Sequence, residues 1–427
     1  MEWVTNSFCG VHTGLVEKSS FERVAGIHRT RRISVPLVAG VLAAVIASFI
    51  FFYPTNKKKD VVVPADNEPL LVAKDRTEEN ENVKGSVVDI QGEDKAQFSK
   101  DIKSILLDKL WSVSFPKPVT SSPAVADDRV VFGCRDGKLY SFNLSGEKLW
   151  EYNSKSGIGA SPAIVGDIVI CANYAGRVFA VKLSNGEEVW VAETGEKIVS
   201  SPRVYGDRVY LGTVRGKFVA IDKDNGKLQW SKRLGIGIWG NACIGPDYII
   251  VPTMDGYLVR LKKNGETLWK IKFSKGIYSS PLCIDEKDRV IFGCKDGYLY
   301  CYTLSRGKLL WKLRAGAEVN SPIVQTNGKI IFGSKSGYMF AVSLDGSELW
   351  RRLLSGPILS RPEIIDETVL VTNYGKELVA LELNTGKVLK RFKASSPIYS
   401  SCCYSNNRVF FGSNGGTFYA VTMYDEK

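Results

Sequence analysis

Short apolar stretches alternate with turn-forming residues over most of the chain, and one stretch shows the repeating unit clearly. In residues 220–230, an alternating apolar run is followed by Asn225-Gly226 and then by a second short run that ends in tryptophan. Alternation with a period of two residues is typical of a half-buried strand, and Asn-Gly tolerates the positive φ of a tight hairpin. The pattern therefore predicts two antiparallel strands joined by a tight turn. Similar stretches recur at 180–190 and 380–389.

Two markers repeat with a common period. The first is a tryptophan, found at Trp111, Trp150, Trp190, Trp230, Trp269, Trp311 and Trp350, with Leu389 in the eighth place. The steps between these positions are 39, 40, 40, 39, 42, 39 and 39 residues. The second marker is a Ser-Pro-like pair, found at Ser122-Pro123, Ser161-Pro162, Ser201-Pro202, Asn241-Ala242, Ser280-Pro281, Ser321-Pro322, Arg361-Pro362 and Ser401-Cys402. A period of about 40 residues with several short strands per repeat predicts a β-propeller with one blade per repeat, and hence eight blades.

Each repeat is expected to form four strands, and the two ends of the chain are expected to share one blade. In the first repeat the strands are predicted near 123–126, 129–133, 138–143 and 148–153. The segment 109–114 carries the first tryptophan but has no earlier strands of its own repeat, whereas the last repeat, 397–424, has only three strands. We therefore expect 109–114 to complete the last blade and close the ring without a free edge.

The repeat carries the motif Ala-x-Asp-x-x-(Thr/Asn)-Gly-x-x-x-Trp, as seen in residues 220–230. Over roughly 109–424 the chain resembles the pyrroloquinoline-quinone-like (quinoprotein alcohol dehydrogenase-like) propellers, which include a non-catalytic, BamB-like branch. The resemblance implies that each of the seven tryptophans docks between adjacent blades and that the joint at Leu389 is weaker. The motif specifies a fold much better than it specifies a function.

The chain ahead of the propeller divides into three parts. Residues 1–32 are a polar segment, and 33–53 form a run of 21 residues without charge, long enough to cross a membrane as a helix. Residues 54–104 have the composition of a disordered tether, which we expect to end in a short amphipathic helix. The helix is predicted from apolar residues spaced as one helical face, namely Phe98, Ile102, Ile105 and Leu106. Residues 105–427 are assigned to the propeller.

We interpret 33–53 as an uncleaved, single-pass membrane anchor. A cleaved signal peptide is the alternative, but the run is too long and starts too late in the chain for one. Five Lys and Arg residues precede the span closely and three follow it, which places the propeller on the non-cytoplasmic side. The nine cysteines are not arranged as a disulfide framework, and this favours a reducing compartment instead.

The propeller region carries few of the groups that catalysis would require. The chain has two histidines, His12 and His28, and both precede the predicted anchor. The repeats also leave no room for the long loops that build a quinone pocket in the catalytic relatives. We interpret Cys402-Cys403 as two substituted core positions, and Asp-Gly pairs such as Asp136-Gly137 as hairpin turns. The sequence therefore predicts a protein without catalytic residues, cofactor or metal.

The distribution of charge suggests a binding surface. Residues 101–427 carry 44 Lys and Arg against 32 Asp and Glu, so the basic excess belongs to the propeller. The basic residues that follow the tryptophan position cluster in five consecutive repeats, at Lys232, Arg233, Lys270, Lys272, Lys312, Arg314, Arg351, Arg352, Lys390, Arg391 and Lys393. This one-sided distribution favours contact with an anionic partner, such as an anionic membrane surface or polymer, whereas nothing in the pattern indicates a nucleic-acid-binding module.

A second candidate region is one mouth of the central channel. Trp239, Tyr278 and Tyr399 each precede a Ser-Pro-like pair, so we expect them to ring that mouth, where they either plug the channel or hold a ligand. The function we predict is that of a membrane-anchored, non-catalytic scaffold for protein–protein interaction, in envelope or outer-membrane protein assembly. A quinone-dependent oxidoreductase and a ligand-sensing propeller that signals through the anchor are the alternatives.

Overall fold

A computed structural model describes residues 105–425 of the chain. The segments 1–32 and 33–53, the tether 54–104 and the positions Phe98 and Ile102 lie outside the described residues, so the predictions made for them stay predictions. Within 105–425 there is no helix of the length and apolar character that a membrane crossing requires.

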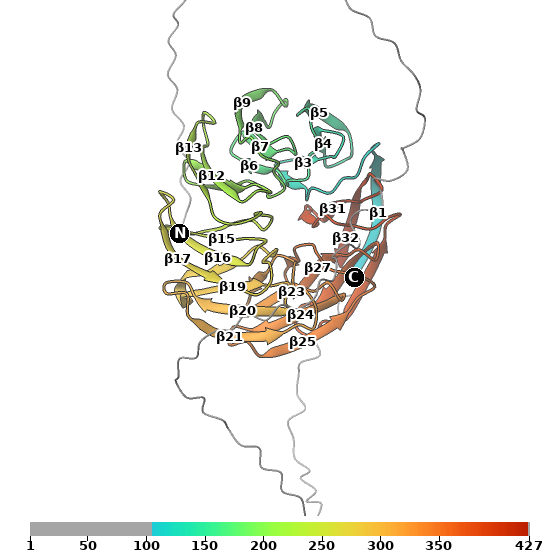
Figure 1. Ribbon diagram of the computed structural model, residues 1–427. Helices are drawn as coiled ribbons and strands as arrows, with labels where there is room; N and C mark the ends of the chain where they lie inside the picture. The colour runs from blue at the N-terminus through green and yellow to red at the C-terminus, as the bar shows by residue number, and fades with distance from the viewer. Residues whose placement is uncertain (1–104, 426–427) are drawn as a thin grey trace, which may run out of the picture. The chain divides into compact units, whose positions relative to one another are not determined.

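The described residues form eight antiparallel sheets of four strands each, as the repeats predict (Figure 1). Blade 1 comprises β2 (Ala124–Ala126), β3 (Arg129–Gly133), β4 (Lys138–Asn143) and β5 (Lys148–Asn153). Blade 2 comprises β6 (Ala163–Val165), β7 (Ile168–Ala172), β8 (Arg177–Lys182) and β9 (Glu188–Glu193). Blade 3 comprises β10 (Arg203–Tyr205), β11 (Arg208–Gly212), β12 (Lys217–Asp222) and β13 (Leu228–Arg233). Blade 4 comprises β14 (Cys243–Ile244), β15 (Tyr248–Pro252), β16 (Tyr257–Lys262) and β17 (Thr267–Lys272).

The remaining blades repeat this order. Blade 5 comprises β18 (Leu282–Ile284), β19 (Arg289–Gly293), β20 (Tyr298–Thr303) and β21 (Leu309–Arg314), with the 3-10 helix η1 (Asp285–Lys287) inserted after β18. Blade 6 comprises β22 (Val324–Thr326), β23 (Lys329–Gly333), β24 (Tyr338–Ser343) and β25 (Glu348–Leu353). Blade 7 comprises β26 (Glu363–Ile365), β27 (Thr368–Thr372), β28 (Glu377–Glu382) and β29 (Val388–Lys393). Blade 8 comprises β30 (Cys403–Ser405), β31 (Arg408–Gly412), β32 (Thr417–Asp425) and β1 (Ile105–Ser114).

The ring closes through the first strand of the described chain. β1 is the outer strand of blade 8, where it pairs antiparallel with β32 from Ile105 opposite Asp425 to Ser114 opposite Thr417 (Figure 1). The sequence placed this strand at 109–114 and assigned Ile105 and Leu106 to a helix, and that helix assignment is wrong. Ile105 and Leu107 alternate in the strand and are only 2% and 3% exposed, so pairing with β32 and burial outweigh the local helical spacing.

The tryptophans join neighbouring blades. In each of seven joints the indole Nε1 donates a hydrogen bond to a backbone carbonyl of the next blade; Trp150, for example, donates to Leu183 at 2.8 Å, and Trp350 to Leu383 at 2.9 Å. The indole also lies against the glycine of the next blade's outer hairpin. A Cβ added to Gly386, whose φ is +67°, would lie 2.5 Å from the Trp350 ring, so this turn needs a glycine on both counts.

The eighth joint differs from the one that the sequence predicts. Ala341 pairs with Trp350 in blade 6, whereas the equivalent Ala380 pairs with Lys390 in blade 7. The tryptophan position of blade 7 is therefore occupied by Lys390, and the assignment of Leu389 to that position is wrong by one residue. Each outer strand carries a one-residue β-bulge directly before the tryptophan position, and Leu389 is the bulged residue of β29.

A belt of hydrogen bonds surrounds the central channel where the inner strands begin. In the belt, the amide at six of the eight Ser-Pro-like positions donates to the side chain of the next blade. These bonds run from Ser122 to Ser161, Ser161 to Ser201, Ser201 to Asn241, Asn241 to Ser280, Arg361 to Ser401 and Ser401 to Ser122, all between 2.8 and 3.0 Å. The last of these bonds connects the two ends of the propeller.

Blade 6 interrupts the belt. Ser321 Oγ donates to the Gly333 carbonyl at 2.9 Å, which is the bond that Ser121 makes in blade 1 with Gly133. Pro322 therefore takes the belt position, and the Ser321-Pro322 pair is displaced by one residue from the pairs to which the sequence matched it. Proline has no amide N–H and no hydroxyl, so it can neither donate to the belt nor accept from it.

Candidate interaction surface

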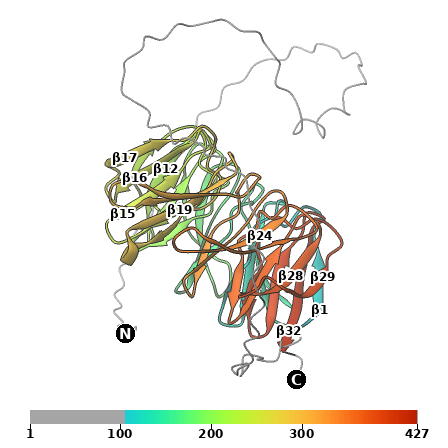
Figure 2. The same ribbon diagram turned by 90° about the horizontal axis from the view of Figure 1, so that it is seen from below.

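The eleven basic residues predicted to form an anionic-partner surface lie on the outer strands of five consecutive blades, β13, β17, β21, β25 and β29 (Figures 1 and 2). Nine of them are exposed, and Lys232 and Lys390 are half-buried. Lys390 is half-buried because it takes the tryptophan position in the joint between blades 7 and 8. Each of these strands is the outer edge of its sheet.

Some of these cations support the ring itself. Three form ion pairs, which join Arg233 to Glu196 at 2.7 Å, Arg351 to Glu348 at 3.2 Å and Arg391 to Glu377 at 2.6 Å. Others donate to backbone carbonyls outside their own strand, as Lys232 does to Gly265, Lys270 to Leu234 and Arg352 to Gly386, each at 2.9 Å. Part of the basic pattern therefore has a structural use that the sequence did not reveal.

The remaining cations have no carboxylate partner among the described residues. Lys272 lies over the Tyr257 ring of its own blade at 4.2 Å and donates to the Asp255 carbonyl, whereas Lys312 lies over the Tyr298 ring of its blade at 5.2 Å. Within residues 105–425, neither they nor Arg314 and Lys393 have a carboxylate within ion-pair distance. The side chains of Lys312, Arg314 and Lys393 form no hydrogen bond to any described group either, so these three are the least constrained exposed cations of the surface.

Exposed leucines accompany these cations. On blades 4 to 6, Leu268 is 41% exposed, Leu310 45% and Leu349 47%, and all three are bulged residues that directly precede the tryptophan. Leu309 and Leu353 on the same strands are 50% and 55% exposed. The sequence did not predict these exposed side chains, because an apolar residue in a strand is ordinarily expected to be buried. The signal that could have indicated them is the recurrence of a leucine directly before the tryptophan, at Leu268, Leu310 and Leu349. We call the exposed leucines and cations of β17, β21 and β25 the leucine–basic rim.

Blades 1 and 2 offer a contrast at the same structural position. Leu149 and Val189 are 42% and 44% exposed there, but the charges beside them are acidic and paired. Glu151 is 2.9 Å from Lys148, and Glu193 is 3.2 Å from Arg177. Apolar exposure at this position is thus shared by blades 1, 2, 4, 5 and 6, whereas among these blades the outer-strand cations without an ion-pair partner in the described chain lie on blades 4 to 6.

The predicted channel-mouth residues lie in the connectors that lead to the inner strands. Trp239 and Tyr278 stack on each other with ring centroids 5.5 Å apart, and Trp239 remains 40% exposed. Tyr399 belongs to blade 8, away from this stack, and is 45% exposed. Two further tyrosines, Tyr174 and Tyr374, lie in hairpin turns beside these connectors, and their amides donate to the connector carbonyls of Gly157 and Pro357, both at 2.9 Å. The sequence missed both because they belong to turns rather than to the Ser-Pro-like connectors.

The cysteine pair and the Asp-Gly turns are integrated into the fold. Burial raises the pKa of the Cys403 thiol to about 11 and raises that of Cys402 as well, so both are protonated at neutral pH. In the Asp136-Gly137 turn, the Asp136 carboxylate accepts from the Tyr140 hydroxyl at 2.7 Å and from the Lys138 amide at 3.0 Å. Residues 105–425 contain no cluster of three or more His, Cys, Asp or Glu side chains that could hold a metal ion.

The fold and the repeat define the chain as a β-propeller of the pyrroloquinoline-quinone-like class. Residues 95–321, more than half of the chain, match the family described as "Beta-alanine-activating enzyme, beta-propeller", and the chain belongs to that propeller family. Residues 341–426 match the family described as "Outer membrane protein assembly factor BamB". None of the curated proteins compared with the chain matches it.

Solved structures share this fold at low sequence identity. BamB from Moraxella catarrhalis superposes with a TM-score of 0.65 at 17% identity, over 74% of this chain and 100% of BamB. A europium-containing methanol dehydrogenase gives 0.65 at 13% identity, over 76% of this chain and 94% of the enzyme. The quinohemoprotein alcohol dehydrogenase from Comamonas testosteroni gives 0.62 at 13% identity, over 75% and 77% of the two chains. The propeller thus resembles both an assembly factor and oxidoreductases, and at these identities the likeness establishes the fold alone.

Proposed function

We propose that this chain is a membrane-tethered, non-catalytic propeller that binds an acidic protein partner through its leucine–basic rim. The observation that carries the proposal is the exposure of leucines and cations on the same outer strands of blades 4 to 6, where Lys312 and Arg314 have no ion-pair partner among the described residues. Exposed apolar side chains flanked by one sign of charge suit a protein interface, where the apolar groups supply affinity and the charges supply orientation.

The rim is suited to a protein more than to a lipid surface. Its leucines occupy the same register position on successive blades, so they form separate anchors along the periphery. Because these strands are sheet edges, they also present unpaired backbone groups that a partner's polar side chains or strand could contact. The likeness to BamB supports a role as a scaffold in envelope or outer-membrane protein assembly.

The anchor and its orientation complete the proposal. The uncharged run 33–53 would hold the propeller at a membrane, with the propeller on the non-cytoplasmic side. Four of the cysteines are compatible with an oxidising compartment, because burial raises the pKa of the thiols of Cys134, Cys171, Cys294 and Cys301 to about 12. A buried, protonated thiol reacts slowly, so these four do not conflict with the non-cytoplasmic side.

Site-specific photo-crosslinking in native membranes tests the rim. A benzophenone amino acid replaces Leu310 on β21 in one variant and Leu149 on β5 in the other, since the two leucines share a register position and are 45% and 42% exposed. We expect a discrete protein adduct from position 310 and none from position 149. The adduct should weaken in a Lys312→Glu/Arg314→Glu background, because neither cation has a described carboxylate partner whose loss would disturb the blade.

Three results would contradict the proposal. They are equal adducts from positions 149 and 310, an adduct that is indifferent to the charge reversal, and an adduct to lipid alone. A variant that lacks 33–53 serves as the control for tethering, and it should leave the membrane fraction. If it stays there, the anchor assignment is wrong even though the rim assignment stands.

A further inference from the structure

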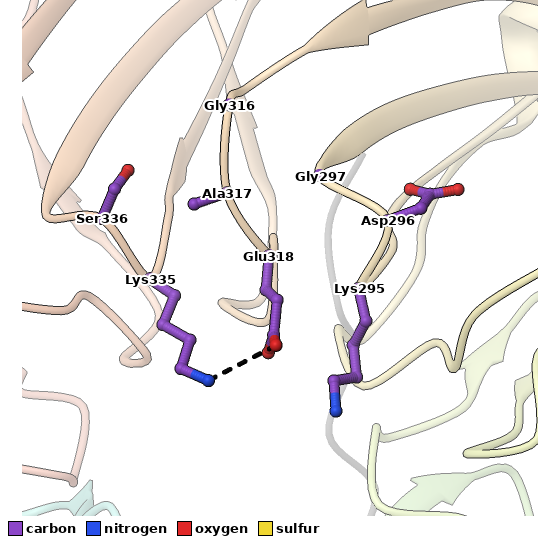
Figure 3. Close-up of a pocket in the computed structure, with 8 residues that line it drawn as sticks. All are labelled: Lys295, Asp296, Gly297, Gly316, Ala317, Glu318, Lys335 and Ser336. Atoms are coloured by element: carbon purple, nitrogen blue, oxygen red, sulfur yellow. Dashed lines mark ion pairs between the residues drawn. The ribbon is translucent and has the colours of Figure 1, made fainter. Parts of the chain in front are cut away.

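The channel mouth of blades 4 to 6 holds an aromatic step next to an open basic hollow. The step is the stacked pair Trp239 and Tyr278, and Ile236, in the same connector as Trp239, is 69% exposed beside it. The hollow has a volume of about 400 Å³ and lies between blades 5 and 6, where Lys295, Glu318 and Lys335 line it (Figure 3). The step provides an apolar contact, and the hollow provides charge.

Lys295 connects the two parts. Its ammonium lies 4.7 Å from the centre of the Tyr278 ring, on the edge of the step, and the same side chain lines the hollow. A ligand that contacts Lys295 therefore reaches the aromatic pair on one side and the hollow on the other. Within the described residues Lys295 has no ion-pair partner, so its charge is free to meet an anionic group.

The hollow is lined by two lysines and by two carboxylates, Asp296 and Glu318, and of these carboxylates only Glu318 lies within ion-pair distance of a lysine of the hollow. Both oxygens of Asp296 hold its own turn, by accepting from the Tyr298 amide at 3.1 Å and the Tyr300 hydroxyl at 2.8 Å. Asp255 accepts from the Ile236 amide at 3.0 Å. Glu318 alone reaches a lysine of the hollow, with its carboxylate 3.4 Å from the Lys335 ammonium.

The position of Glu318 indicates the kind of ligand. In Figure 3 its carboxylate lies between the side chains of Lys335 and Lys295. A nucleic acid strand would bring a phosphate close to that carboxylate, and the two negative charges would repel each other. A peptide can place its own carboxylates on the lysines and an amide N–H on Glu318, so the charges of the hollow favour a peptide over a nucleic acid strand.

The hollow also lies where the belt of hydrogen bonds is broken. The amide of Ser280 in blade 5 has no hydroxyl to donate to at position 322, because that residue is a proline. Pro322 in turn has no amide proton to donate to blade 7. A second hollow of about 400 Å³, lined in part by Asn327, Arg361 and Glu363, lies between blades 6 and 7, at the end of β23 opposite to Lys335. Both openings therefore flank the one blade that is not tied into the belt.

We propose that this mouth binds an extended acidic peptide segment of a partner protein, with an apolar side chain on Trp239 and Tyr278 and carboxylates on Lys295 and Lys335. This site lies on the channel face, away from the leucine–basic rim on the periphery, and it does not depend on the rim. Aromatic rings and lysines combine in it as they do in many peptide-binding grooves, where the ring buries area at low entropic cost and the charge fixes direction.

Fluorescence anisotropy on the full-length chain in detergent tests the site. The probe is a labelled peptide of about ten residues, made of Asp and Glu around a single Phe, and its control replaces each acid with the corresponding amide. We expect the acidic peptide to bind with an affinity that falls as salt rises, and the amide peptide to bind at least about tenfold more weakly. This comparison uses the unmodified chain, so it does not depend on the folding of any variant.

Variants then locate the peptide. Lys295→Glu/Lys335→Glu should weaken binding by at least about tenfold, and Trp239→Ala by about threefold or more. The matched control is Lys287→Glu/Lys308→Glu, which makes the same change of charge in blade 5 at turns away from the mouth and should retain most of the affinity. Lys312→Glu/Arg314→Glu on the rim should also retain it, so failure of the rim proposal and failure of this one are distinguishable.

Four outcomes would overturn the proposal. The first is equal binding of the acidic and amide peptides. The second is a loss of binding in the control pair Lys287→Glu/Lys308→Glu, or in the rim pair, as large as the loss in the mouth pair. The third is binding by the mouth variants like that of the unmodified chain, and the fourth is binding of a single-stranded oligonucleotide of similar length as tight as that of the acidic peptide. Any of these would show that charge in general, or another class of ligand, accounts for the binding.

Discussion

Seven joints of the ring contain a tryptophan, and the joint between blades 7 and 8 contains Lys390 instead. Each indole docks on the outer hairpin of the following blade, where it meets a glycine and a free carbonyl, as Trp350 meets Gly386 and Leu383. Blade 8 has no such hairpin, because its outer strand β1 comes from the other end of the described chain. A tryptophan at position 390 would have no turn on which to dock.

The eighth joint is closed by apolar packing of β1 rather than by a tryptophan. β1 has ten residues, whereas the other outer strands have six, and its added residues run beside the end of β32 (Figures 1 and 2). Ile105 and Leu107 of this extension pack with Leu389 and Phe392 of blade 7 in one apolar cluster. The tryptophan is therefore present only where the next blade has an outer hairpin to receive it. At the joint that closes the ring there is no such hairpin, and apolar packing takes the place of the tryptophan. Whether this joint is weaker than the others, as the sequence suggests, stays a prediction.

The largest effect is expected from removing the closing strand. Deletion of 105–115 would expose the edge of β32 and remove Ile105 and Leu107 from their cluster, so the melting temperature should fall by more than it does for any single substitution in the ring. Thermal denaturation followed by circular dichroism measures the change. An unchanged melt would show that the ring does not close in this way.

A pair of matched substitutions compares the two kinds of joint directly. Trp350→Ala should lower the free energy of unfolding by about 3–5 kcal/mol, because the indole is 8% exposed and its hydrogen bond is lost with it. Lys390→Ala, at the equivalent register position, should change it by no more than about 0.5 kcal/mol, because no hydrogen bond or ion pair of the described residues depends on that side chain. Denaturant titration measures both. Similar losses would mean that Lys390 does hold the eighth joint.

The smallest effect concerns the bulged leucines. Leu389→Ala should cost about 1–2 kcal/mol, because Leu389 packs against the cluster of Ile105 and Leu107. Leu349→Ala should stay within about 0.5 kcal/mol, because that leucine is 47% exposed at the same register position. The same titration distinguishes them. If Leu349 proved as costly to remove as Leu389, the exposed leucines would be structural, and the leucine–basic rim would lose its main argument.

Much of the candidate surface could be predicted from the sequence, and the rest depended on contacts between neighbouring blades. The one-sided distribution of cations was evident, because a strand's position in its repeat fixes its place on the rim. Which cations are free was not evident, since Lys232 and Arg352 bond to carbonyls 33 and 34 residues away, at Gly265 and Gly386. The basic hollow was missed altogether, because Lys295, Glu318 and Lys335 meet only when blades 5 and 6 pack together.

The sequence by itself determined the eightfold repeat, the four strands of each blade and the sharing of the last blade by both ends. These features follow from period-two alternation and turn chemistry, which act within a few residues. Only the tertiary structure decided that Ile105 begins a strand, that Lys390 takes the eighth tryptophan position and that Pro322 breaks the belt. Each of these depends on contacts between distant segments, and a one-residue displacement within a repeat becomes visible only once the register between strands is set.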